Sequence, residues 1–62
     1  MSEKRLIEIK KMLLSQKKIL TKDICEKFHI SIETARRDLN KLEKEGVLRK
    51  VYGGAVLADD SL

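Results

Sequence analysis

The chain has 62 residues, of which 39% are charged and only 3% are aromatic. This size and composition fit one small, mostly helical domain with an aliphatic core, and they argue against a large catalytic cleft. Fourteen Lys and Arg against ten Asp and Glu give a net charge of +4, a moderate bias toward polyanionic partners. The single Cys25 excludes an internal disulfide. The sequence has no signal or membrane segment, so we expect a cytoplasmic protein with no membrane association. Because no second Cys is present to complete a metal or redox motif, we expect no metal site, and we expect no cofactor.

The first predicted element is a helix that follows the N-cap Ser2 and runs to about Leu14. Its apolar residues recur at helical spacing and occupy more than half of the helix circumference. These residues are Leu6, Ile7, Ile9, Met12, Leu13 and Leu14. A stripe of this width predicts a central helix that packs against the rest of the domain on two sides.

Residues 17–20 break the helical period, and they form either a short strand or an extended link. Thr21 is the expected N-cap of a short second helix that ends near Phe28. Asp23 in its first turn has the charge that the helix dipole favours. Ile24, Cys25 and Phe28 form its predicted inward face.

A third helix is expected from the N-cap Ser31 to about Glu45, with Gly46 as the left-handed residue that ends it. Its predicted buried line is Ile32, Ala35, Leu39 and Leu42. Residues 47–51 and 55–57 are expected to form two strands joined by a glycine turn. The sequence therefore predicts a mainly α fold with a small β-hairpin, a winged helix-turn-helix of three helices plus a wing.

The third helix has the pattern of a helix that reads DNA. A helix-turn-helix places the start of its second helix in the major groove. The planar guanidinium groups of Arg36 and Arg37 can each donate to O6 and N7 of guanine, so these arginines are the expected base readers. Ser31 and Thr34, together with the free N–H groups at the helix start, suit a phosphate. Lys41 lies farther along the exposed face.

The glycine turn carries a second set of candidate DNA contacts. Arg49, Lys50, Tyr52 and Gly53 form a basic hairpin tip that is expected to reach the DNA backbone or the minor groove. A hairpin that merely needs two glycines would explain the turn equally well. It would not explain the adjacent cations.

Two alternatives compete with DNA reading. Arg36 and Arg37 can form a solvated face that pairs with Glu33 or Asp38, and a winged helix can serve as a protein-interaction module without DNA binding. The basic surface of the third helix argues against the second alternative. An enzyme is not expected, because the chain has one His, one Cys and no nucleotide-binding glycine loop.

Residues 31–39, followed by Leu42-Glu43, Gly46 and the stretch 52–55, closely resemble the deoxyribose-operon repressor (DeoR) family. The resemblance covers almost the whole chain, including Arg5 in the first helix. Two departures occur: Ala35 stands where the family usually has Ile or Val, and Tyr52 where His is common.

The resemblance implies a bacterial repressor of sugar-catabolism or phosphotransferase operons that binds double-stranded operator DNA. It also implies a C-terminal domain, absent from these 62 residues, that senses sugar phosphates and supports oligomerisation. We therefore expect a DNA-binding domain at residues 1–57 and the start of a linker at residues 58–62. The isolated domain is expected to be a monomer, and the full-length regulator an oligomer.

Overall fold

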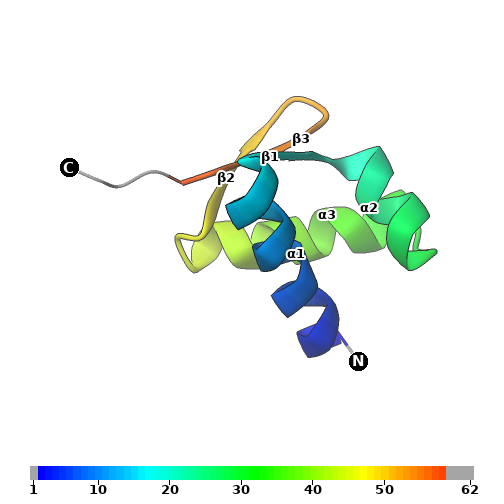
Figure 1. The fold of residues 1–62 in the computed structure, drawn as a ribbon. Helices are drawn as coiled ribbons and strands as arrows, with labels where there is room; N and C mark the ends of the chain where they lie inside the picture. Colours follow the sequence, from blue (N-terminus) through cyan, green and yellow to red (C-terminus); the bar gives the residue numbers. More distant parts are fainter. Residues whose placement is uncertain (1, 59–62) are drawn as a thin grey trace.

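The computed structural model describes residues 2–58 and contains three helices and a small sheet (Figure 1). The elements in chain order are α1 (Ser2–Gln16), β1 (Lys18–Leu20), α2 (Thr21–Phe28), α3 (Ile32–Lys44), β2 (Leu48–Val51) and β3 (Gly54–Leu57). This arrangement confirms the predicted winged helix-turn-helix, with the β2–β3 hairpin as the wing. Among the helices of residues 2–58, none has the length and apolar character needed to cross a membrane.

The sheet has three antiparallel strands in the order β1-β3-β2. Residues 18–20 are therefore a strand, which settles the choice between strand and link. Gly54 pairs with Leu20 on one side and Val51 on the other. A Cβ on Gly54 would lie 2.1 Å from the backbone oxygen of Ile19, so only glycine lets β1 approach β3 this closely.

The core lies between one face of α1, the inward faces of α2 and α3, and the sheet. Its buried residues are Leu6, Ile9, Leu13, Ile19, Ile24, Ala35, Leu39, Leu42, Leu48 and Ala55. The prediction that α1 packs on two sides was wrong, because Ile7 is 48% exposed and Leu14 is 63% exposed. With only two other helices and three short strands, the domain covers one side of α1 and leaves the other to solvent.

Local chemistry explains where α3 begins and ends. The Ser31 side chain accepts a hydrogen bond from the backbone N–H of Thr34 at 3.2 Å, which confirms Ser31 as the N-cap. Gly46 has the expected left-handed backbone, with φ of 83°.

The starts of the other two helices differ from the prediction. Thr21 is not a cap: α2 begins at Thr21 itself, its N-cap is Leu20, and no side chain caps it. The backbone N–H of Thr21 instead donates to the carbonyl oxygen of Gly53 at 2.9 Å. This tertiary bond satisfies a free N–H group at the start of α2, as a capping side chain would, and it connects α2 to the wing. The first helix includes Ser2, predicted to precede it, and continues two residues past Leu14.

Candidate nucleic-acid interface

A hollow of about 600 Å³ lies between the start of α2, one face of α3 and the wing. Its lining residues are Thr21, Lys22, Ile32, Arg36, Asn40, Lys50, Val51, Tyr52 and Gly53. Four of the predicted DNA contacts, namely Arg36, Lys50, Tyr52 and Gly53, therefore meet here although they come from two separate elements. We call this concavity the wing hollow.

The wing hollow explains why one predicted core residue is not buried. Ile32 was expected on the buried line of α3, but it is 56% exposed. Residues four apart share one face of a helix, so Ile32, Arg36 and Asn40 form a row toward the wing. Ala35, Asp38, Leu39 and Leu42 form the buried row. The helical spacing of the apolar residues had assigned Ile32 to the wrong row.

Arg36 and Arg37 are exposed and free of the predicted acidic partners. The buried Asp38 binds Arg5 of α1 instead, through a hydrogen bond from Arg5 Nε to Oδ2 and one from Nη2 to Oδ1 at 3.2 Å. The hydrogen bond to Asp38 raises the pKa of Arg5 further above its ordinary value, so Arg5 stays protonated. Within residues 2–58 neither Arg36 nor Arg37 forms a salt bridge, which removes the support for a paired, solvated face.

The start of α3 presents hydroxyl groups close to its free backbone N–H groups. The hydroxyl oxygens of Ser31 and Thr34 lie 3.1 Å apart, and either can be the donor. One of the two O–H groups is engaged in this bond, so the other is left to donate. This is the group that a phosphate at the helix start would need.

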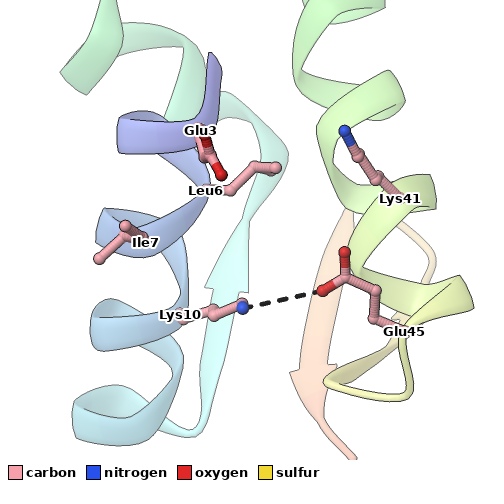
Figure 2. A pocket seen from close by; sticks show the side chains of 6 residues that line it. All are labelled: Glu3, Leu6, Ile7, Lys10, Lys41 and Glu45. Carbon is pink, nitrogen blue, oxygen red and sulfur yellow. Dashed lines mark ion pairs between the residues drawn. The ribbon is translucent and has the colours of Figure 1, made fainter. Parts of the chain in front are cut away.

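Lys41 lies apart from the wing hollow. It lines a second hollow between α1 and the end of α3, together with Glu3, Leu6, Ile7, Lys10 and Glu45 (Figure 2). Lys10 Nζ bridges that hollow to Glu45 Oε1 at 3.7 Å. The fold therefore places Lys41 apart from the predicted contacts that line the wing hollow, although Arg37 lies one turn before it on α3. The role of Lys41 in DNA binding stays a prediction.

The two cations of β2, Arg49 and Lys50, point in different directions. Lys50 is on the same side of β2 as the buried Leu48, and its Nζ donates to Oδ1 of Asn40 at 2.5 Å. Its backbone N–H donates to Glu43 Oε2 at 3.0 Å. Arg49 is exposed on the opposite face, where it pairs in register with Val56.

The sequence reasoning missed three polar residues of the wing hollow: Thr21, which it took only for a helix cap, Lys22 and Asn40. Lys22 is in the first turn of α2, and its position beside a helix start was a usable signal for a phosphate contact. Asn40 lies one turn beyond Arg36, which also suggested the same face. The missing information was the position of the wing relative to α3.

Comparisons with known proteins agree with this geometry. The model of the DeoR-like helix-turn-helix domain matches residues 5–61. The chain is 40% identical over 50 residues to the HTH-type transcriptional regulator IolR of Bacillus subtilis, a match that covers 81% of this chain and 20% of IolR. It is 42% identical over 55 residues to the HTH-type transcriptional repressor GlcR of the same organism, with 89% and 21% covered. It is 45% identical over 51 residues to the lactose phosphotransferase system repressor of Staphylococcus aureus, with 82% and 20% covered. The chain thus spans about a fifth of the length of these relatives. No solved structure matches it significantly.

Proposed function

We propose, since this chain belongs to the DeoR-like helix-turn-helix family, that it is the operator-reading domain of a bacterial repressor of sugar metabolism genes. A domain of this family binds double-stranded DNA in the regulation of transcription. The observation that carries the proposal is the wing hollow, where basic groups of α2, α3 and the wing converge, namely Lys22, Arg36 and Lys50. Within residues 2–58 Arg36 has no acidic partner. The names of the lactose phosphotransferase system repressor and of GlcR support the repressor assignment.

In the proposed complex α3 lies in the major groove, with Arg36 and Arg37 reading guanine edges. The other proposed contacts to phosphates, to the minor groove or to base edges are Ser31, Thr34, Lys41, Arg49, Lys50, Tyr52 and Gly53. We add Lys22 to this proposal because it lines the wing hollow. No residue is assigned a catalytic role. A protein-interaction module is not favoured, because the exposed side of α3 carries charged side chains rather than an apolar patch.

Selection of bound duplexes from a random library tests this function directly. We expect a short conserved motif to emerge, with guanines at the positions that face the start of α3. Recovery of no motif at low salt, from protein with native circular dichroism, would contradict sequence-specific DNA binding.

DNA affinity is expected to fall steeply with salt concentration. If about four cations contact phosphates, the logarithm of the binding constant declines with a slope of about −4 against the logarithm of salt concentration. The reason is that each neutralised phosphate releases condensed counterions. Titrations by fluorescence anisotropy between about 50 and 200 mM salt measure the slope. Lys22→Ala should make it shallower by about 1. An affinity independent of ionic strength is incompatible with these contacts.

The full-length regulator is proposed to be cytoplasmic and oligomeric, and to respond to a sugar phosphate through a C-terminal domain. The relatives are about five times longer than the matched region, which leaves room for such a domain. We propose residues 1–57 as the DNA-binding unit and residues 58–62 as the start of the linker. Residue 1 and residues 59–62 lie outside the described residues.

The isolated chain is expected to be monomeric, to bind one half-site weakly and to ignore sugar phosphates. A stable dimer buries about 800 Å² per partner, roughly a sixth of the 4566 Å² surface of this domain. The exposed large apolar side chains are spread over α1, the strands and the wing hollow, so no single face offers that area. They are Ile7, Leu14, Leu20, Ile32, Val51 and Tyr52.

Analytical ultracentrifugation at micromolar concentration measures the oligomeric state. Operator titrations with and without a panel of sugar phosphates measure the response to effector. A stable dimer, or an affinity that shifts with effector, would show that these functions do not depend on a further domain.

A further inference from the structure

Asn40 is the only uncharged polar side chain that α3 presents to the wing hollow in the described structure. It is exposed and lies one helical turn beyond Arg36. Its carbonyl oxygen Oδ1 accepts the hydrogen bond from Lys50 Nζ at 2.5 Å. The backbone of Lys50 is itself fixed to α3 by the bond from its N–H to Glu43 Oε2 at 3.0 Å. The wing strand therefore holds the Asn40 amide from one side.

We propose that Lys50 orients Asn40 as a reader of hydrogen-bond acceptors on a base edge. This inference rests on the proposed function and adds a specificity residue to it. The oxygen and nitrogen of an amide point in different directions from one carbon. When Oδ1 faces the wing, the NH₂ group faces away from the wing, toward the DNA side of the hollow.

The orientation of the amide decides which base Asn40 reads. A free asparagine pairs with adenine through both its oxygen and its nitrogen. With Oδ1 turned to Lys50, the amide presents two donors, and Lys50 adds further N–H donors beside it. Acceptors on the major-groove edge are N7 and O6 of guanine, O4 of thymine, and N7 of adenine, which lies beside an amino donor. Asn40 therefore favours guanine or thymine. It disfavours cytosine, because the amino group of cytosine is itself a donor.

The experiment compares the motifs that the parent chain and its variants select from one random duplex library. Asn40→Ala is expected to reduce the preference at one base pair by roughly 5- to 30-fold, the equivalent of one or two hydrogen bonds. Asn40→Asp keeps an oxygen for Lys50 but replaces the donors with an acceptor. It should shift the preference at that pair toward cytosine or adenine, which present amino groups.

Lys50→Met and Arg49→Met separate orientation from simple charge. Each removes one cation from β2, but only Lys50 contacts Asn40. Lys50→Met is expected to relax the preference at the same base pair as Asn40→Ala. Arg49→Met is expected to weaken binding to all sequences and to leave the motif unchanged.

The possible outcomes separate this inference from the proposed function. A parent chain that selects no motif contradicts the proposed function itself. A parent motif that Asn40→Ala and Asn40→Asp both retain at every position overturns the reading role of Asn40. Lys50→Met that lowers affinity uniformly, without change in the motif, overturns the orienting role and leaves Lys50 as a phosphate contact.

Discussion

Replacing Arg36 or Arg37 with alanine is expected to lower operator affinity by about 1–3 kcal/mol, the cost of one lost guanine contact. Both side chains are exposed and lack salt bridges within residues 2–58, so neither substitution removes an interaction that stabilises the fold. Affinity for unrelated duplexes should fall much less, because the other phosphate contacts are retained. Anisotropy titrations on the selected operator and on a scrambled duplex measure the two effects.

Lys44→Ala is the matched control for these variants. Lys44 is an exposed cation in the last turn of α3, beyond the residues that line the wing hollow. Its loss should weaken operator and scrambled DNA by similar factors. If both arginine variants bound operator like the parent while circular dichroism stayed native, α3 would not be the reading helix.

The features of the fold that depend on neighbouring residues could be predicted from the sequence. Ser31 caps α3 through a residue three positions away, and Gly46 ends it through its own backbone angle. The helical period gave three of the four buried positions of α3, and it included the buried positions of α1 in a stripe that was too wide. Each of these signals is local, so it can be read without knowledge of the tertiary structure.

Features that depend on distant pairing could not be predicted. The strand at residues 18–20 is defined by its partners on β3, more than thirty positions away. Thr21 resembles an N-cap, but the carbonyl of Gly53 satisfies its backbone N–H. The apolar pattern of α1 likewise gives no information on which side the small domain leaves exposed.

The candidate site shows the same division between local and distant information. The basic face of α3 followed from helical spacing, but which of its two edges meets the wing did not. The wing lies beside Arg36 and Asn40, whereas Lys41 lies beside α1. A rotation of about 100° per residue orders these side chains around the helix axis, but only the packing of the hairpin shows which of them share a concave surface.

Arg5→Met is expected to lower the free energy of unfolding by about 2–3 kcal/mol, the largest stability effect that we predict. The side chain of Asp38 is only 7% exposed, and Arg5 is its sole hydrogen-bond partner within the described residues. Methionine fills a similar volume but leaves the carboxylate buried without a donor. A domain of this size has a total stability of only about 3–9 kcal/mol, so the loss is a large fraction of it. Urea unfolding followed by circular dichroism measures it.

Lys10→Met provides the matched control, because it also removes a cation of α1 that pairs with an acidic residue, the C-cap Glu45 of α3 (Figure 2). The side chains of Lys10 and Glu45 are 42% and 45% exposed, so this pair is screened by water and its loss should cost less than about 1 kcal/mol. The double variant Arg5→Met with Asp38→Leu should regain most of the stability that Arg5→Met loses, since no charge is then left buried. Equal losses for Arg5→Met and Lys10→Met would contradict this account. They would indicate that Asp38 finds water or another donor once Arg5 is gone. Burial would then not increase the contribution of this ion pair to the free energy of unfolding.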